Sequence, residues 1–318
     1  MSLGDALTRA RWRVVDALVA AKRRLPTAWY RSPGDRFGHA LVSPGMGLVS
    51  LLAVGLVLLA YYSVLTYDPY EVLIYEFSLA SWTEFLTEPA YLRIFVRTFL
   101  MSAFVTVLAV ALGFPYAYLT IRTDSALARK VLLAGVLVPF FTGVIVRAYG
   151  WLIVFGKHGF LNYVLSLVGL GPVQVVGTPI AVAVGLTQIM IPYSVLMIAP
   201  SIEAIDRSVE QAAKNLGAGP VATFRYVVLP LAKPGLTAAA VVTFTISMAA
   251  FSVPDFLGAG LFDFVANFVY STLFNASNYP LASVMSLVLV TVTSLIVLVV
   301  FRYVGAGTMS LEGGVGRD

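Results

Sequence analysis

The chain has 318 residues, of which 59% are hydrophobic and only 12% are charged, and its formal net charge is +5. Soluble domains carry about 25% charged residues, so this composition indicates an integral membrane protein. The absence of cysteine excludes disulfides and thiolate metal sites, and two histidines are too few for a histidine-rich metal centre. We therefore expect no metal and no cofactor. We also expect no nucleic-acid partner, although the net charge is positive, because the chain is a membrane protein.

Residues 1–44 are polar and basic, and apolar residues recur at helical spacing between positions 3 and 25. This pattern predicts a basic amphipathic helix in a cytoplasmic tail. Two interpretations stay open: an interfacial helix on the anionic cytoplasmic leaflet, or a solvated tail whose charges only fix topology. A cleavable signal peptide is not expected, because the apolar core that follows is too long and lacks a small-residue cleavage site.

Six apolar segments follow, each about the twenty residues that a hydrocarbon core requires. Their predicted limits are Gly45–Tyr67, Thr98–Ile121, Val131–Phe155, Ile180–Pro200, Leu236–Leu257 and Leu281–Tyr303. Pro139 and Pro192 are expected to interrupt helix hydrogen bonds within the third and fourth. The fold class is therefore all-α, with a six-helix membrane domain at residues 45–303 and a short tail at 304–318.

The placement of Lys and Arg orients these spans. With the N-terminus inside, seventeen basic residues fall on the cytoplasmic side and three, Arg93, Arg97 and Lys157, on the outer side. The positive-inside rule then predicts that both termini are cytoplasmic. The first outer loop is acidic and aromatic, with Ser81 as the expected N-cap of a short surface helix. The loops at 156–178 and 258–280 are glycine-rich, and we expect them to pack on the membrane surface or against a docking protein.

The stretch from Asp206 to Gly235 is the longest polar interruption of the apolar region, and it predicts two short helices joined by a tight corner. Ser208 is the expected N-cap of the first helix, and Gly217 suits the left-handed residue that ends it. Pro220 fits the first position of the second helix, which Pro230 is expected to end.

This stretch resembles the signature E-A-A-x3-G-x9-I-x-L-P of the membrane subunits of bacterial ABC importers. The resemblance implies an ABC importer permease fold in which this loop is the coupling helix that docks on an ATP-binding subunit. The candidate coupling residues are Glu210, Gln211, Ala212, Ala213, Gly217, Leu229 and Pro230. Gln211 stands where the family has glutamate, which removes one charge from the contact and leaves its shape. The alternative is an ordinary cytoplasmic helical hairpin.

No catalytic constellation is present in the sequence. The segment from Gly150 to His158 only superficially resembles a phosphate-binding loop, because its glycine spacing is one residue too long and no Ser or Thr follows Lys157. We therefore expect a transport subunit that is not itself an enzyme, with ATP hydrolysed by a partner.

Ionisable residues within membrane spans are costly and are usually functional. Arg147, beside Tyr149 and Trp151, either snorkels outward or faces the pore or a partner subunit. Asp255, between Pro254 and Gly258, either sits at a broken helix end where it guides a cationic amine, or is an interfacial carboxylate in water. These four residues, Arg147, Tyr149, Trp151 and Asp255, are the candidate substrate path.

The narrower resemblance is to permeases of the spermidine/putrescine type, carried by RAYGWLIVFGKHGFLN, by the segment from Ile191 to Gly235, and by FSVPDFLGAG. It implies a bacterial inner-membrane subunit that forms a heterodimer, or less often a homodimer, with a second permease. Two ATP-binding subunits inside and a solute-binding protein outside complete the importer, with alternating access driven by ATP. Ferric iron, thiamine and 2-aminoethylphosphonate are alternative cargoes within this class.

Two other classes remain as alternatives. An ion-coupled secondary transporter normally carries ionisable residues near the membrane midplane or broken helices in repeated halves, and the predicted spans offer no midplane carboxylate. A membrane scaffold without transport activity would have no need of the coupling loop.

Overall fold

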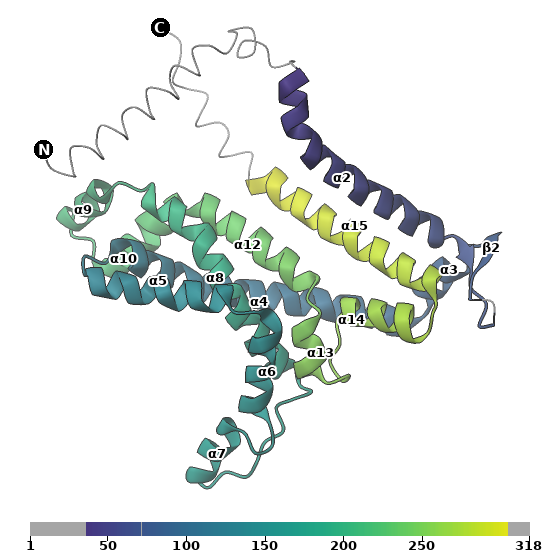
Figure 1. Ribbon diagram of the computed structural model, residues 1–318. Helices are drawn as coiled ribbons and strands as arrows, with labels where there is room; N and C mark the ends of the chain where they lie inside the picture. The colour runs from purple at the N-terminus through teal and green to yellow at the C-terminus, as the bar shows by residue number, and fades with distance from the viewer. Residues whose placement is uncertain (1–35, 71, 305–318) are drawn as a thin grey trace, which may run out of the picture. The chain divides into compact units, whose positions relative to one another are not determined.

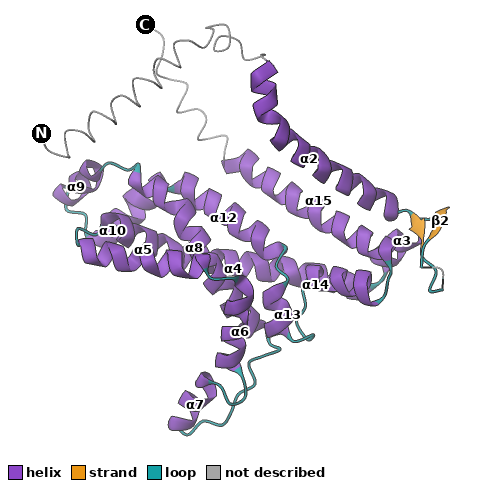
Figure 2. Cartoon of the chain, viewed as in Figure 1, coloured by secondary structure: helices purple, strands orange, loops and turns teal. Residues whose placement is uncertain are grey.

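The computed structural model describes residues 36–70 and 72–304, and these residues are mostly helical (Figures 1 and 2). The amphipathic helix predicted for residues 3–25, and the tail beyond Val304, lie outside the described residues. The elements are α2 (Arg36–Tyr62), β1 (Leu65–Thr66), β2 (Ile74–Phe77), α3 (Ala80–Thr87), α4 (Pro89–Arg122), α5 (Ala126–Phe141), α6 (Val144–Phe155), α7 (Phe160–Leu167), α8 (Pro179–Glu203), α9 (Arg207–Asn215), α10 (Pro220–Thr223), the π-helical turn η2 (Phe224–Val228), α11 (Leu229–Leu231), α12 (Lys233–Met248), α13 (Ser252–Gly258), α14 (Val265–Tyr270), the π-helical turn η3 (Ser271–Asn275) and α15 (Tyr279–Val304).

The chain divides into two bodies, with the boundary after Leu58. The first body contains most of α2, which begins at Arg36 and so starts before the predicted limit at Gly45. Pro44 lies within this helix. The second body, from Leu59 onward, contains all the other elements described below.

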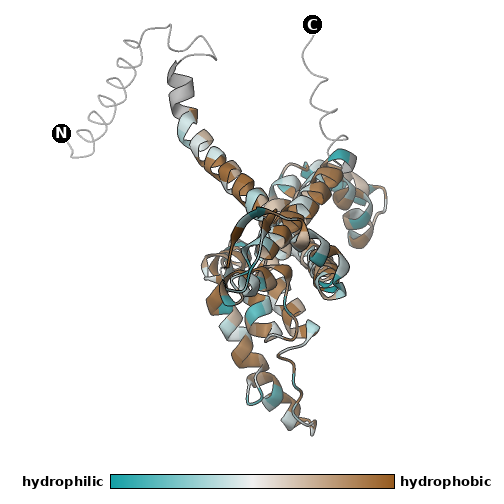
Figure 3. Cartoon of the chain, turned by 90° about the vertical axis from the view of Figure 1, so that its right-hand side faces the viewer, coloured by the Kyte–Doolittle hydropathy of each residue, from teal (hydrophilic) through white to brown (hydrophobic). Residues whose placement is uncertain are grey.

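Within the second body, α4, α8 and α12 form the packed centre (Figure 1). Small residues allow the backbones of these helices to approach closely, which is the usual means of helix association in membranes. A Cβ atom on Gly113 of α4 would lie 2.6 Å from Ser194 Oγ of α8, and one on Gly235 of α12 would lie 2.5 Å from Ser201 Oγ. Many large hydrophobic side chains of this body are exposed, among them those of Leu100, Val107 and Leu298, as expected for helices surrounded by lipid. Figure 3 colours the chain by residue hydropathy, and hydrophobic residues occur along its helices.

Five described segments are long and apolar enough to cross a membrane: Val42–Tyr62, Pro89–Arg122, Val144–Leu167, Pro179–Glu203 and Tyr279–Arg302. A sixth is reached when Pro220–Leu231 and Lys233–Met248, which are bent by 72°, count as one broken span. The predicted all-α polytopic class is confirmed, and the predicted number of six is reached only with this bent pair.

Two predicted spans are wrong as continuous helices. The third, Val131–Phe155, is divided into α5 and α6, because Thr142 has extended backbone and Gly143 starts the next helix. α6 leaves the bundle at a steep angle and leads to α7 (Figure 1). The fifth, Leu236–Leu257, ends as α12 at Met248, before the separate short helix α13. Pro192 does not end α8, which continues to Glu203.

The outer loops contain more structure than their glycine content predicted. The loop at 156–178 contains α7. The loop at 258–280 begins at the last residue of α13 and contains α14. The short helix expected in the first outer loop is present as α3, but Ser81 is not its N-cap. Ser81 is buried in the first turn, and the Ser78 hydroxyl accepts the Ala80 N–H instead. Phe85 of α3 packs with Leu281 and Met285 of α15.

Candidate functional site: the coupling loop and the outer cavity

The coupling loop folds into the predicted corner. α9 ends at Asn215, and Gly217, two residues later, is left-handed with a φ of 91°. The Ala218 N–H donates to the Ala213 carbonyl at 3.0 Å. This six-to-one bond is the closing contact of a Schellman motif. Pro220 begins α10, where its missing N–H leaves no bond unmade. The conformational predictions for Gly217 and Pro220 are therefore confirmed.

The N-cap prediction for this loop is wrong. α9 starts at Arg207, and the carboxylate of Asp206 accepts the Ser208 N–H at 2.8 Å. The cap is two residues earlier than predicted because aspartate caps a helix as well as serine does. Hydrogen bonding from the Ser208 backbone lowers the pKa of Asp206 below its usual value, as expected for a capping carboxylate.

Pro230 does not end its helix at once. It lies in α11, which ends at Leu231, and Pro234 lies in the first turn of α12. The chain bends at Ala232, which is fully buried, so the bend is packed against the protein interior. A helix can start at a proline because its first N–H groups have no intrahelical partner.

The candidate coupling residues do not share one surface. Gln211, Ala212, Gly217, Leu229 and Pro230 are exposed, and Ala213 is half-buried. Apolar side chains beside them also face outward: Leu216, Val221 and Tyr226 are 89%, 78% and 71% exposed. Such a group of exposed apolar residues on a polar loop is typical of a protein contact surface.

Glu210 points the other way, into the protein. Its side chain is 7% exposed, and its Oε1 accepts Arg122 Nε at 2.7 Å. Its second oxygen, Oε2, accepts the Tyr118 hydroxyl at 2.8 Å. Arg122, the last residue of α4, also donates from Nη2 to the carbonyls of Ile202 and Ile205 at 3.1 and 2.7 Å.

Sequence reasoning missed Tyr118 and Arg122 as partners of the loop. In the sequence, Arg122 contributes only to the count of basic residues that orients the spans. Its contact with Glu210 joins residues 88 positions apart, so local sequence patterns do not reveal it. The available signal was weak: an arginine at a span end and a glutamate adjacent to the coupling motif. A second ion pair, between Arg207 and Asp124 at 2.9 Å, lies nearby and is exposed.

At the outer side, the structure brings together only some of the candidate substrate-path residues. Tyr149 of α6 packs against Phe256 of α13, with ring centroids 4.5 Å apart and ring planes inclined by 42°. Asp255, the neighbour of Phe256, is exposed. Trp151 turns to the apolar interior, where its ring lies 5.0 Å from that of Phe155.

Arg147 is on the same helix as Tyr149, but its guanidinium is only partly solvated. Within the described residues, Nε and Nη1 of Arg147 are buried and have no hydrogen-bond partner. Tyr193 of α8 is close enough to interact with it electrostatically. A buried guanidinium nitrogen without a partner is costly, and the role of Arg147 in a substrate path stays a prediction.

A cavity of about 510 Å³ lies where α12 ends and α13 begins, against α8. Its polar lining groups are Tyr193, Thr245 and Ser252, among mostly apolar neighbours. Sequence reasoning did not single out these residues, because hydroxyl side chains occur commonly in membrane helices. The helix break at Ala249 to Phe251 that opens the cavity was predicted several residues too late.

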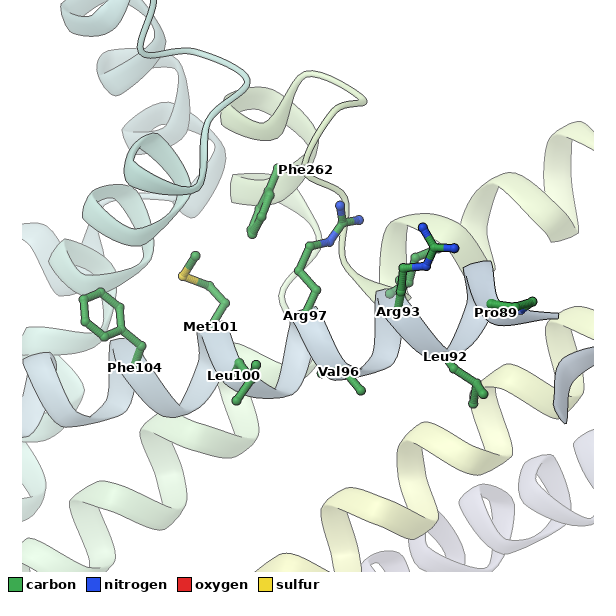
Figure 4. A pocket seen from close by; sticks show the side chains of 10 residues that line it. Pro89, Leu92, Arg93, Val96, Arg97, Leu100, Met101, Phe104 and Phe262 are labelled. Atoms are coloured by element: carbon green, nitrogen blue, oxygen red, sulfur yellow. The ribbon is translucent and has the colours of Figure 1, made fainter. Parts of the chain in front are cut away.

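A second hollow, of about 830 Å³, follows the outer half of α4 and is almost wholly apolar (Figure 4). Arg93 and Arg97 project from the same side of the helix. Arg97 donates to the carbonyls of Leu261 and Asp263, and its guanidinium lies 4.7 Å from the ring centroid of Phe262. Burial raises the pKa of Asp263, Arg97 opposes the rise, and Asp255 adds to it. These contacts hold the loop after α13 against α4.

No group of three or more acidic, histidine or cysteine side chains that could hold a metal ion occurs in the part of the chain that the structure describes. The two candidate sites are therefore the loop from Asp206 to Gly235 and the cavity at the break between α12 and α13.

Comparison with known protein families identifies the class. The family described as "binding-protein-dependent transport system inner membrane component" matches residues 35–308. The chain belongs to this family. It is accordingly a multi-pass inner-membrane transport component, and the ABC importer permease resemblance is confirmed.

Individual relatives agree with this assignment. The chain is 30% identical over 242 residues to the spermidine/putrescine transport system permease protein PotB of Haemophilus influenzae, which covers 76% of this chain and 84% of that protein. It is also 30% identical over 274 residues to the inner membrane ABC transporter permease protein YdcU of Escherichia coli, covering 82% and 87%.

Solved structures agree on the fold. A chain of a bacterial alginate ABC transporter, in complex with its alginate-bound periplasmic protein, superposes with a TM-score of 0.71 at 15% identity, covering 87% of this chain and 96% of that one. A chain of the MetNI methionine ABC transporter superposes with a TM-score of 0.54 at 21% identity, covering 69% and 98%.

Proposed function

We propose that this permease imports polyamines of the spermidine and putrescine type. The relatives with that assigned cargo align along most of both chains at 30% identity. Asp255, exposed at the start of α13 near the aromatic residues Tyr149 and Phe256, supplies a carboxylate and π faces suited to a cationic amine. Ferric iron, thiamine and 2-aminoethylphosphonate, the alternative cargoes, have no comparable support among these relatives.

The single observation that carries the transport mechanism is the folded coupling loop with its exposed apolar side chains. Leu216, Val221 and Tyr226 form a surface that a groove on an ATP-binding subunit can bury. Two such subunits, a second permease and an external solute-binding protein complete the proposed importer. ATP binding draws the two coupling loops together and opens the cavity outward, and hydrolysis resets it.

The proposed orientation places both termini and the coupling loop in the cytoplasm. It is supported by the excess of Lys and Arg in the tail and in the loops around Arg122 and Arg207. Reporter fusions at Gly169 and Gly219 test it independently of transport: the first should report an outer location and the second an inner one. The reverse pattern would refute this orientation.

The test of function is reconstitution of the complex in vesicles with the cognate solute-binding protein. Spermidine and putrescine should stimulate ATP hydrolysis and accumulate only when the loaded receptor and ATP are both present. Thiamine, ferric iron and 2-aminoethylphosphonate serve as competing cargoes in the same assay. Receptor-dependent uptake of one of these, without uptake of polyamines, would reassign the cargo within the class. Uptake driven by an ion gradient without ATP would overturn the importer mechanism.

A further inference from the structure

The Arg122–Glu210 pair differs from the other ion pair of the described residues in its burial. The side chains of Arg122 and Glu210 are 13% and 7% exposed, whereas those of Arg207 and Asp124 are 49% and 87% exposed. Exposed pairs contribute little because water competes for both charges. A buried pair that loses one partner leaves an uncompensated charge, so it fixes the position of the groups it joins.

Arg122 joins three elements at one point. Its Nε contacts Glu210 of α9, and its Nη2 reaches the carbonyls of Ile202 and Ile205, at the C-terminal end of α8 and just beyond it. The last carbonyls of a helix have no intrahelical partners and carry partial negative charge, so a guanidinium satisfies them well. Arg122 itself ends α4. A displacement of α9 is therefore resisted by both α4 and α8.

Aromatic packing extends this junction to the second half of the loop. Tyr118, whose hydroxyl donates to Glu210 Oε2, meets Phe224 edge-on with ring centroids 5.2 Å apart. Phe114, one turn earlier on α4, lies 4.7 Å from the same ring. Both arms of the loop, α9 through Glu210 and η2 through Phe224, are thus anchored to the cytoplasmic end of α4.

We infer that Arg122 and Glu210 are positioning residues that transmit movement of the coupling loop to α4 and α8, and that Glu210 acts inside the permease instead of touching the ATPase. This inference rests on the proposed coupling function and names the residues that connect the coupling loop rigidly to α4 and α8. Glu210 is closed off by its own chain, and the neighbouring Gln211 is exposed. Motion of α9 reaches α4 and α8 together because one guanidinium holds all three.

The test compares Arg122→Gln with Arg207→Gln in the reconstituted complex. Each variant removes one positive charge from the same cytoplasmic region, but only the first opens a buried pair. Arg122→Gln should lower uptake per ATP hydrolysed by at least tenfold while the amount of co-purifying ATPase stays within twofold. Arg207→Gln should stay within twofold in both measurements. Arg122→Lys keeps the charge but loses the fork to two carbonyls, so its uptake per ATP should fall about threefold.

A second measurement needs no transport activity. Amide hydrogen exchange of residues 207–215 should quicken at least tenfold in Arg122→Gln and remain unchanged in Arg207→Gln. Equal effects of the two variants in either assay would overturn the inference, as would an Arg122→Gln complex with unchanged coupling. Loss of ATPase binding in that variant would also overturn it, by showing an assembly role. The wild-type arm tests the proposed function itself: without receptor-stimulated hydrolysis there, that function fails, and hydrogen exchange alone decides the role of Arg122.

Discussion

The two ends of the second body hold their ionisable groups in opposite ways. At the coupling loop, the side chains of Arg122 and Glu210 are only 13% and 7% exposed, and they pair at 2.7 Å. On α6 and α13, Asp255 is exposed, and two guanidinium nitrogens of Arg147 are buried without a partner among the described residues. A fully satisfied buried network rigidifies its surroundings, whereas an unpaired buried polar group is costly. We therefore expect the loop to be the more rigid region and the region around Arg147 to be the part that rearranges.

The helix breaks support the same contrast. A cavity lies at the gap between α12 and α13, and Thr245 and Ser252 are among its lining residues. Non-helical backbone within a membrane is tolerated where it lines a cavity or is buried in protein. The two helix breaks of the coupling loop differ from this one. At Gly217 the backbone is hydrogen-bonded in a Schellman motif, and at Ala232 the residue is fully buried in the protein. Changes that strain the loop should abolish coupling, and changes in the outer region should alter cargo preference.

The largest effect is expected at Gly217, where the fixed geometry depends on positive φ. Valine is strained in left-handed backbone, so Gly217→Val should abolish transport while membrane insertion remains intact. A Cβ at this position would meet no atom within 4 Å, so the strain comes from the backbone alone. Gly219, with φ of −69° and equally open surroundings, is the matched control, and Gly219→Ala should transport normally. Receptor-stimulated ATP hydrolysis in the reconstituted complex is the measurement. Stimulation that survives in Gly217→Val would show that the loop does not need this corner.

The next effect concerns the outer region and cargo choice. Asp255→Asn should reduce polyamine uptake at least tenfold if the carboxylate pairs with an amine in a partly dehydrated mouth, because a charge-assisted hydrogen bond contributes about 1.5–3 kcal/mol. Asp263→Asn is the control, because that carboxyl lies in the same region but is partly buried. Uptake of spermidine and putrescine is compared with that of an anionic phosphonate. Equal amine uptake by Asp255→Asn and wild type would remove this residue from the pathway.

Local sequence patterns predicted the backbone conformation of the coupling loop better than they predicted the helix breaks around α6 and α13. The backbone preferences of glycine and proline are local properties that can be read from the sequence, and the structure confirms the conformations predicted for Gly217 and Pro220. The break after Met248 was predicted several residues too late and the division at Gly143 was not predicted, because both lie within continuous apolar segments of the sequence. The contact of Arg122 with Glu210 is long-range, so no local pattern encodes it. Burial decided the orientation of Glu210, and burial is a tertiary property.

A smaller effect concerns the start of α9 and depends on pH. Because hydrogen bonding lowers the pKa of Asp206 in the folded protein, its capping contribution is present above the unfolded value of about 3.9 and is lost as the pH falls through the folded pKa. Exchange of the first α9 amides should therefore be constant between pH 7 and about pH 5, after correction for intrinsic rates, and should quicken below about pH 4. Asp206→Asn, which also caps, should remove the acid step and preserve protection at pH 7.

The Asp124 carboxyl titrates in the same direction, because Arg207 lowers its pKa, so Asp124→Asn is required as a control. An acid step that persists in Asp206→Asn and disappears in Asp124→Asn would assign the pH dependence to the exposed ion pair and not to the helix cap.

The smallest effect is expected at Gln211, beside the buried glutamate. Gln211 is exposed, and both carboxylate oxygens of Glu210 already accept hydrogen bonds within the permease. Gln211→Glu therefore adds a charge to the exposed side of α9 without disturbing the Arg122–Glu210 pair. Acidic residues in the first turns of a helix are also mildly favourable. Uptake and receptor-stimulated hydrolysis should stay within twofold of wild type. Gln211→Lys is the opposite-sign control, and it should weaken docking if the groove of the ATPase is basic. A large gain in coupling for Gln211→Glu would show that the ionic contact at this position is limiting, whereas a tenfold loss would show that the partner surface requires the neutral amide.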